Sequence, residues 1–265
     1  AFFKLANVMP IDEAVDFMKA AAKKSYGKKG DAVVEMNYKA IDAGVDAVHK
    51  VEVPASWSNP EADPAPAKLT GRPETVKMVE DLMNPIALMD GDSLPVSAFM
   101  GNPDGQFEQG ASAYEKRGTA VTVPTWDAAK CIQCNQCAFV CSHATIRPFM
   151  LSEDEVKAAP SNIKVADTKP KASEYKYTMS VSPLDCMGCG ECITVCPVGA
   201  IEMVPQESQA DEQPVFDYLV ANVSKKPGMP ADNTVKGSQF NQPLLEFSGS
   251  CAGCAETSYA RLITQ

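Results

Sequence analysis

The sequence predicts an α+β fold built around a small duplicated domain. Two runs of four cysteines share one spacing, at residues 131–141 and 186–196, so that each cysteine of the second run stands the same distance after its counterpart. Segments of alternating β-branched and aromatic residues precede both runs, at 119–123 and 175–181. Residues 10–44 instead carry apolar residues at helical spacing.

The first 50 residues predict two helices. Residues 10–24 place Ile11, Val15 and Met18 at helical spacing, with acids at the start and lysines at the end, as the helix dipole favours. Residues 26–30 contain two glycines and break this helix. A second helix is expected over residues 32–43 and should end near Gly44.

No regular period persists from residue 53 to about residue 126. Prolines and glycines interrupt this segment throughout, and only residues 74–83 have a helical pattern. Its many apolar residues argue against a purely flexible linker. We therefore expect an irregular connector that wraps another surface.

The spacing C-x-x-C-x-x-C-x-x-x-C is that of a bacterial iron–sulfur run, whose fourth cysteine ligates the other cluster in two-cluster ferredoxins. We therefore expect a bacterial two-cluster ferredoxin-like domain. Its ligands group as Cys131, Cys134, Cys137 and Cys196 for one [4Fe–4S] cluster and Cys186, Cys189, Cys192 and Cys141 for the other.

The flanks of the two runs repeat as well. Each half is expected to form a strand, a ligand loop, a short helix and a strand, and the strands should pair into hairpins that cover the clusters. One difference separates the halves: Pro197 follows the last cysteine of the second run, whereas Ser142 stands there in the first. Because the metal bonds come from sulfur, the site should survive this change, and Ser142 could add a hydrogen bond near the cluster of Cys141.

Zinc and disulfides are the alternatives for these cysteines. A structural zinc site uses two cysteine pairs separated by a longer loop, and a third cysteine at the same step has no use in one tetrahedron. With 10 cysteines in 265 residues, the chain is far from the density of a disulfide scaffold. His49 and His143 raise the possibility of a Rieske-type cluster, but since eight cysteines already satisfy two clusters, we expect ordinary surface histidines.

The formal net charge of -10 makes nucleic acid an improbable partner. The sequence has no apolar stretch long enough to span a bilayer, so no membrane is expected, and its start resembles no signal peptide. We expect a soluble protein of the cytoplasm or another reducing intracellular compartment.

A third C-x-x-C pair, Cys251 and Cys254, lies near the C-terminal end beside glycines and before a helical pattern. Two cysteines cannot close a cluster, so an isolated redox or zinc half-site is one interpretation. The chain starts without methionine and stops within an apolar helical pattern. We therefore expect an internal fragment of a longer protein.

The chain resembles the pyruvate:ferredoxin (flavodoxin) oxidoreductases over nearly its whole length. The residues that carry the resemblance are 26–30 (YGKKG), 91–99 (GDSLPVSAF), 114–118 (YEKRG), 131–141 (CIQCNQCAFVC) and 251–257 (CAGCAET). The resemblance implies the helical end of a preceding domain over 1–52, a connecting segment over 53–125, the two-cluster domain over 126–215 and the start of an α/β thiamine diphosphate-binding domain over 216–265.

The resemblance also implies roles for individual residues. Cys251 and Cys254 match two ligands of a third [4Fe–4S] cluster, and Glu256 matches a glutamate near the thiamine diphosphate, although Ala255 stands where the family commonly has glycine. The diphosphate and Mg²⁺ ligands have no matching motif here, so no catalytic set is complete in this chain.

The activity implied by the resemblance is oxidative decarboxylation of pyruvate with CoA. The electrons would pass to ferredoxin or flavodoxin, and the full-length form would be a homo-oligomer. Two alternatives remain: a free-standing two-cluster electron carrier that does not need Cys251 or Cys254, and a related oxidoreductase that acts on another 2-oxo acid or is fused to a nicotinamide reductase.

Overall fold

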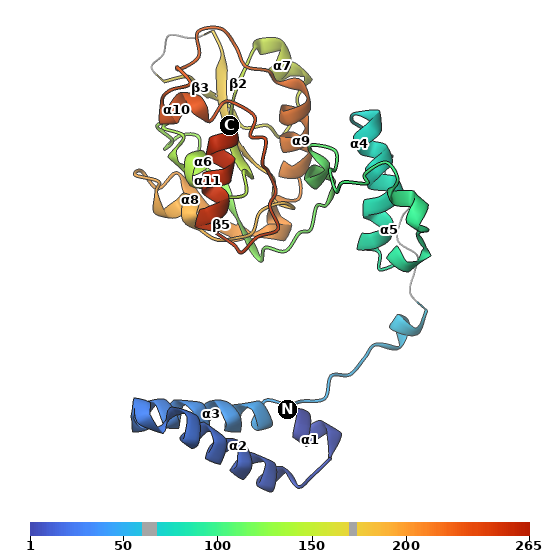
Figure 1. Ribbon diagram of the computed structural model, residues 1–265. Helices are drawn as coiled ribbons and strands as arrows, with labels where there is room; N and C mark the ends of the chain where they lie inside the picture. The colour runs from blue at the N-terminus through green and yellow to red at the C-terminus, as the bar shows by residue number, and fades with distance from the viewer. Residues whose placement is uncertain (60–67, 170–173) are drawn as a thin grey trace. The chain divides into compact units, whose positions relative to one another are not determined.

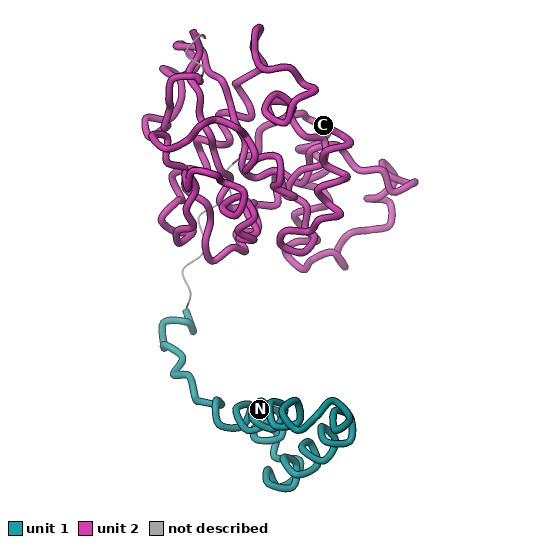
Figure 2. Tube along the Cα trace, turned by 90° about the vertical axis from the view of Figure 1, so that its left-hand side faces the viewer, with its two compact units in different colours: residues 1–67 teal, residues 68–265 magenta. Residues whose placement is uncertain are grey.

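The computed structural model describes residues 1–59, 68–169 and 174–265. The chain divides into two compact units, Ala1–Ala67 and Lys68–Gln265, which Figure 2 shows in different colours. No helix among the described residues combines the length and apolar character that crossing a bilayer requires.

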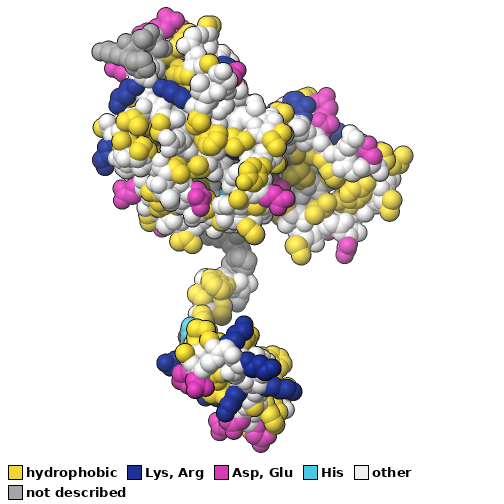
Figure 3. All heavy atoms as spheres, turned by 60° about the vertical axis from the view of Figure 1, so that its left-hand side comes forward, with side chains coloured by type: hydrophobic (Ala, Val, Ile, Leu, Met, Phe, Trp, Pro, Cys, Tyr) yellow, Lys and Arg dark blue, Asp and Glu magenta, His cyan; other side chains and the backbone are white. Residues whose placement is uncertain are grey.

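The first unit is helical, as the sequence predicts. Its two long helices, α2 and α3, lie against one another (Figure 1) and bury only Ala14 and Val34. Lysine side chains gather on the surface of this unit (Figure 3), and its large apolar side chains Phe17 and Met36 are exposed. The elements are α1 (Phe2–Ala6), α2 (Ile11–Tyr26), the 3₁₀-helix η1 (Gly27–Lys29), α3 (Asp31–Asp46) and the 3₁₀-helix η2 (Ala55–Ser58).

The second unit begins with a small helical lobe. The helix expected over residues 74–83 is present, and it continues through a π-helical turn into α5. The lobe has its own core of Met78, Val79, Leu82 and Ala111. Its elements are α4 (Pro73–Met78), the π-helix η3 (Val79–Met83), α5 (Asn84–Ala87) and the 3₁₀-helices η4 (Gly91–Ser93), η5 (Val96–Phe99) and η6 (Ala111–Tyr114).

Five strands form two small antiparallel sheets in the remainder of this unit. One sheet pairs β1 with β5, and the other has the order β2-β4-β3. Their bounds are β1 (Thr122–Trp126), β2 (Ile146–Leu151), β3 (Ala166–Asp167), β4 (Lys176–Val181) and β5 (Ile201–Pro205). The strands expected at 119–123 and 175–181 are therefore present, although β1 starts three residues later than expected.

The pairing of the strands differs from the expected hairpins. β1, the first strand of the first half, pairs with β5, the last strand of the second half. β2 ends the first half and pairs with β4, which begins the second. Both sheets thus join one half to the other. The pattern of a single strand fixes which of its faces is apolar, but it does not name the partner strand.

Along the chain, the remaining helices lie between the strands or follow the last strand. Each ligand loop leads into a short helix, α6 (Gln136–Val140) in the first half and α8 (Glu191–Thr194) in the second, and these two helices contact each other. The C-terminal helix α11 lies over α6 (Figure 1), and Arg261 on α11 donates to the α6 carbonyls of Ala138 and Phe139. The other elements are α7 (Glu153–Ala158), η7 (Gln206–Gln209), α9 (Glu212–Asn222), α10 (Val235–Ser238) and α11 (Ala255–Thr264).

The helix α9 crosses the boundary expected at residue 215. Its residues Val215 and Leu219 are fully buried against Leu151 of β2. Because this contact is apolar and nearly inaccessible to water, the segment after residue 215 packs onto the cysteine-rich domain. α10 and α11 contact α6 instead.

Candidate metal centre

The eight cysteines of the two runs line two separate cavities. Cys131, Cys134 and Cys137 of the first run share one cavity with Cys196 of the second. The other cavity has Cys186, Cys189 and Cys192 of the second run together with Cys141 of the first. Each cavity thus has three thiols from one half and one from the other. This donor set suits a cubic cluster, which takes four thiolates.

Backbone amides point at the sulfur atoms in a pattern that repeats between the halves. The amide of Gln133 donates to Cys131 Sγ at 3.3 Å, and the amide of Gly188 donates to Cys186 Sγ at 3.4 Å. The fourth cysteine of each run receives a similar bond: Thr145 N lies 3.4 Å from Cys141 Sγ, and Ala200 N lies 3.2 Å from Cys196 Sγ. Hydrogen bonds to sulfur favour the thiolate and tune cluster potential.

The ligand loops need left-handed backbone at equivalent positions in each half. In the second half Gly188 and Gly190 adopt φ angles of 67° and 79°, whereas in the first Gln133 and Asn135 adopt 59° and 60°. A Cβ on Gly188 would lie 3.0 Å from Thr122 O, so a larger residue would meet the backbone of β1. The first loop therefore places side chains where the second has glycine.

The amide side chains of Gln133 and Asn135 hold the first loop, and each is only 1% exposed. Gln133 donates to Asp167 O and accepts from Lys169 N, both at 2.7 Å. Asn135 donates to Lys236 O at 2.8 Å and accepts from Tyr177 Oη at 2.7 Å. Neither residue is predicted from the sequence to have a role at the site. Their alignment with glycines in the repeat is the signal that identifies them.

Burial raises the pKa of several of these thiols. The pKa of Cys186 rises to about 11 and that of Cys192 to about 12, chiefly because burial disfavours the thiolate, and the pKa of Cys137 rises further for the same reason. A buried thiol therefore stays protonated at neutral pH until a cation replaces the proton. Metal loading at these cavities is expected to release protons.

His143 is not the surface residue that the sequence analysis expected. Its side chain is 2% exposed and lines the cavity of Cys141, Cys186, Cys189 and Cys192. Burial lowers its pKa, an effect that the bond to Ser248 O opposes and the charge of Arg117 reinforces. The expectation was wrong because the segment after residue 215, which covers this position, lies more than 70 residues further along the chain. His49, in contrast, is exposed, with its Nδ1 3.1 Å from Ala47 O.

Ser142 also has a partner that the sequence did not indicate. Its Oγ lies 2.9 Å from Ser258 Oγ on α11, and the side chain is 2% exposed. Within the part of the chain that the structure describes, this hydroxyl makes no hydrogen bond to a sulfur atom. The residue that replaces proline in the first half therefore links the turn after Cys141 to the C-terminal helix.

Cys251 and Cys254 lie in a tight turn at the start of α11. Cys254 N donates to Cys251 O at 3.0 Å, and Gly253 between them has a φ of 71°. Hydrogen bonds from the Thr257 side chain and backbone lower the pKa of Cys254. Cys251 is exposed and Cys254 is half-buried. The helix start thus favours a thiolate at Cys254, which is the form that binds metal.

Glu256 lies in the first turn of α11 and is exposed. All ten cysteines are free. Within the described ranges, no three His, Cys, Asp or Glu side chains are grouped tightly enough to hold a single metal ion. A cubic cluster makes a different demand from a single ion, because each of its four cysteines binds a different iron and the sulfur atoms stand further apart.

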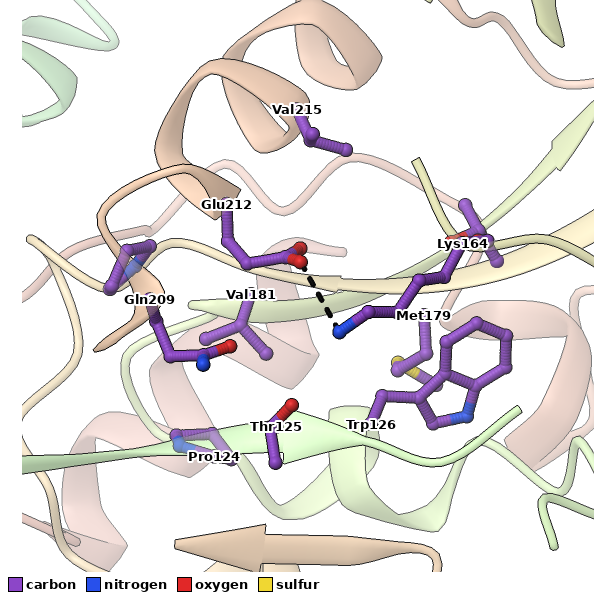
Figure 4. Close-up of a pocket in the computed structure, with 11 residues that line it drawn as sticks. Pro124, Thr125, Trp126, Lys164, Met179, Val181, Gln209, Glu212 and Val215 are labelled. Atoms are coloured by element: carbon purple, nitrogen blue, oxygen red, sulfur yellow. Dashed lines mark hydrogen bonds and ion pairs between the residues drawn. The ribbon is translucent and has the colours of Figure 1, made fainter. Parts of the chain in front are cut away.

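A third cavity lies between the two sheets and α9 (Figure 4). It is lined by Pro124 and Thr125 of β1, by Met179 and Val181 of β4, and by Glu212 at the start of α9. Lys164 Nζ and Glu212 form an ion pair across it at 3.4 Å. No cysteine contributes to this lining, so we assign the cavity to packing between layers and not to the metal centre.

Two families match parts of the chain. Residues 130–200 match the family described as 4Fe-4S dicluster domain, and residues 62–120 match EKR, which is described as a domain of unknown function. The first range contains both cysteine runs and both short helices. These residues therefore belong to a domain that carries two [4Fe–4S] clusters, as the spacing predicts.

The whole chain is similar to pyruvate oxidoreductases. It is 48% identical over 267 residues to the pyruvate-flavodoxin oxidoreductase of Klebsiella pneumoniae and 47% identical over 270 residues to the pyruvate:ferredoxin oxidoreductase of Moorella thermoacetica. It is also 42% identical over 289 residues to the pyruvate dehydrogenase [NADP(+)] of Cryptosporidium parvum. In each case 100% of this chain is covered, but only 22%, 22% and 15% of the relative.

Proposed function

We propose that this chain is the electron-transfer portion of a pyruvate:ferredoxin (flavodoxin) oxidoreductase. The complete protein would oxidise pyruvate with CoA to acetyl-CoA and CO₂ and pass the electrons to ferredoxin or flavodoxin. Two findings support the proposal: the cysteines gather in two cavities of four, and the relatives that match along the whole chain carry these names.

The proposed ligands follow the lining of the cavities. Cys131, Cys134, Cys137 and Cys196 would hold one cluster, and Cys186, Cys189, Cys192 and Cys141 the other. When bound, such clusters take up and release single electrons. The chain itself supplies the thiolates and directs backbone amides at the sulfur atoms.

Cys251 and Cys254 would provide two of the four ligands of a third cluster, and Glu256 would lie near thiamine diphosphate. The assignment of these two cysteines is supported by the turn at the start of α11, where the pKa of the Cys254 thiol is lowered. The other ligands, the Mg²⁺ site and the sites for pyruvate and CoA would lie in the remaining part of the complete protein. We place that protein, as a homo-oligomer, in the cytoplasm or another reducing compartment.

The NADP-linked relatives support a second candidate. The pyruvate dehydrogenases [NADP(+)] of Cryptosporidium parvum and Euglena gracilis match the whole of this chain at 42% and 40% identity. The same electron-transfer portion could therefore serve a protein whose final acceptor is NADP⁺. A free-standing two-cluster carrier has less support, because the similarity extends well beyond residues 130–200 on both sides.

Anaerobic purification of the chain tests the cluster assignment. We expect about eight irons and as many sulfides per chain, with electron paramagnetic resonance signals of two interacting [4Fe–4S] clusters after reduction. In the full-length protein, pyruvate and CoA should reduce flavodoxin or ferredoxin, and Cys251→Ala should abolish this reduction. Stoichiometric zinc in place of iron, or an unaltered Cys251→Ala protein, would contradict the proposal.

A further inference from the structure

His143 makes contacts on both sides of Cys251. Its Nδ1 lies 3.0 Å from Ser248 O, and Gly253 N donates to its Nε2 at 3.3 Å. Its backbone carbonyl accepts from Phe247 N at 2.9 Å. One buried residue thus holds the segment 247–253 at its beginning and at its end.

His143 also lines the cavity that contains Cys141 and Cys189. His143 follows Cys141 by two positions and lines that cavity together with Cys189. Its side chain therefore lies between two groups of thiols: the four in this cavity, and the pair Cys251 and Cys254.

The segment also touches the second ligand loop directly. A Cβ on Gly253 would lie 3.3 Å from Cys189 Cβ and 3.5 Å from Glu191 Cγ. Since these distances leave little free space, a small movement of Gly253 changes the gap between the two groups of thiols. Ser142, the neighbour of His143, forms a second link through Ser258 on the other side of Cys254.

The hydrogen bonds assign the ring proton. Because Nε2 accepts from Gly253, the neutral ring carries its proton on Nδ1 and donates it to Ser248 O. Both polar atoms of the ring are then satisfied, as burial requires. An amide side chain can reproduce either contact, but not both at these positions.

From this geometry we infer that His143 is a positioning residue for electron transfer between the Cys251–Cys254 pair and the cluster held by Cys141, Cys186, Cys189 and Cys192. This inference rests on the proposed function, in which both groups of thiols bind clusters. His143 sets how close the two sites lie and how they are oriented, and it takes no part in binding metal.

The physical reason is the steep dependence of electron transfer on distance. Tunnelling rates fall exponentially as the gap between two centres widens, so a shift on the order of 1 Å at Gly253 is enough to slow transfer severalfold or more. Removal of the imidazole leaves Ser248 O and Gly253 N without their buried partners. The segment would then relax away from Cys189 toward water.

The test uses the full-length protein with four variants: His143→Ala, His143→Gln, His143→Asn and, as the matched control, His49→Ala. His49 is the other histidine of the chain and lies exposed in the first unit. Three properties are measured: iron content, the magnetic interaction between reduced clusters, and two rates of acceptor reduction. One rate starts from pyruvate and CoA, and the other from protein already reduced by dithionite, which bypasses the Cys251–Cys254 site.

We expect His143→Ala to keep its iron while its magnetic interaction changes and its pyruvate-driven rate falls on the order of tenfold. The dithionite-driven rate and all properties of His49→Ala should match those of the unsubstituted protein. His143→Gln and His143→Asn should recover part of the interaction. A merely structural role would not predict a change confined to one magnetic interaction and one of the two rates.

If His143→Ala loses iron, His143→Gln and His143→Asn test the positioning role instead, because each keeps the bulk of the side chain and one of the two contacts. An iron-replete amide variant with a fully normal magnetic interaction and a normal pyruvate-driven rate would overturn the inference. Cys251→Ala separates this result from a failure of the proposed function. If Cys251→Ala loses iron while the His143 variants behave normally, only the role of His143 is wrong.

Discussion

At the scale of single residues, the two halves reach the same loop geometry by different means. The second loop uses glycine at positions 188 and 190, where left-handed backbone carries no steric penalty. The first uses Gln133 and Asn135, whose buried amide side chains each make two hydrogen bonds. The bonds offset the strain of the backbone and tie the loop to β3, β4 and α10.

Replacement of Asn135 by alanine should destabilise the first loop. The change leaves Tyr177 Oη and Lys236 O without their partner and keeps a non-glycine residue at φ 60°. We expect a loss of about 2–3 kcal/mol of unfolding free energy. Thermal loss of visible cluster absorbance measures it, with Asn135→Asp as the control that keeps the contact to Tyr177. Equal melting of Asn135→Ala and the unsubstituted protein would show that these bonds contribute little.

Replacement of Cys196 tests which thiols share a cluster. Cys196→Ala should damage the cluster of Cys131, Cys134 and Cys137, because Cys196 lines that cavity. Its magnetic resonance spectrum should then match that of Cys134→Ala and differ from that of Cys189→Ala, and the iron content should fall by up to about four. A match to Cys189→Ala instead would show that the crossover is absent.

At the scale of elements, the helix α7 shows how local signals and distant contacts combine. Ser152 and Glu155 form a capping box at its start, a pattern of sequence neighbours that satisfies two backbone amides. Lys226, which follows α9, then reaches Glu155 Oε1 at 2.7 Å. α7 is thus fastened to the segment that covers the cluster domain.

This contact predicts a pH-dependent stability. Burial tends to raise the pKa of Glu155, but bonds from Lys226 and Ser152 outweigh it and hold the pKa below its ordinary value of 4.5. A carboxylate with a lowered pKa stabilises the fold above pH 4.5, and this contribution is lost as pH falls through the folded-state pKa. Lys226→Met should therefore lower thermal stability at pH 7, and its effect should shrink as the pH falls through the folded-state pKa of Glu155.

The measurement is the difference in melting temperature between the unsubstituted protein and Lys226→Met. Far-ultraviolet circular dichroism monitors the melting at each pH. Lys225→Met is the matched control, because Lys225 pairs with Asp232 and Asn241 and not with α7. A difference that stays constant from pH 7 to pH 3 would show that the contact to Glu155 is not its source.

At the scale of the whole molecule, both cavities depend on both halves of the repeat. The sheets pair β1 with β5 and β2 with β4, so neither half closes a cavity alone. The apolar core between the sheets contains Trp126 together with Cys137, Cys141 and Cys192. Cluster binding and folding of this domain are therefore expected to be coupled.

Removal of iron should be visible in tryptophan fluorescence. The chain has two tryptophans: Trp57 in the first unit, 68% exposed, and Trp126 in the core beside the cysteines, 6% exposed. Clusters absorb at the wavelengths that tryptophan emits, so they quench a nearby indole. In a Trp57→Phe variant, anaerobic chelation of iron should raise the emission severalfold and then shift it to longer wavelength as the core loosens.

The matched Trp126→Phe variant leaves only Trp57. Its emission shows how an exposed indole responds to the chelator and is the reference for the response of Trp126. A weak response from Trp126 would contradict the placement of the clusters beside the core that contains this residue.

The sequence alone determined the features that depend on neighbours along the chain. These are the cysteine spacing that groups the thiols, the helices over residues 10–44 and 74–83, and the strands before each run. Spacing fixes which side chains share a turn, and local patterns fix which face is apolar, so both can be recognised without knowledge of the partner.

Only the tertiary structure decided which strands pair across the repeat, how His143 becomes buried and which side chains hold Gln133 and Asn135. These features arise from contacts between residues up to about a hundred positions apart, such as Asn135 with Lys236 and His143 with Ser248. Their free energy depends on how all the layers pack at once. His143 thus becomes a buried link between two groups of thiols, because the segment that covers it comes from the far end of the chain.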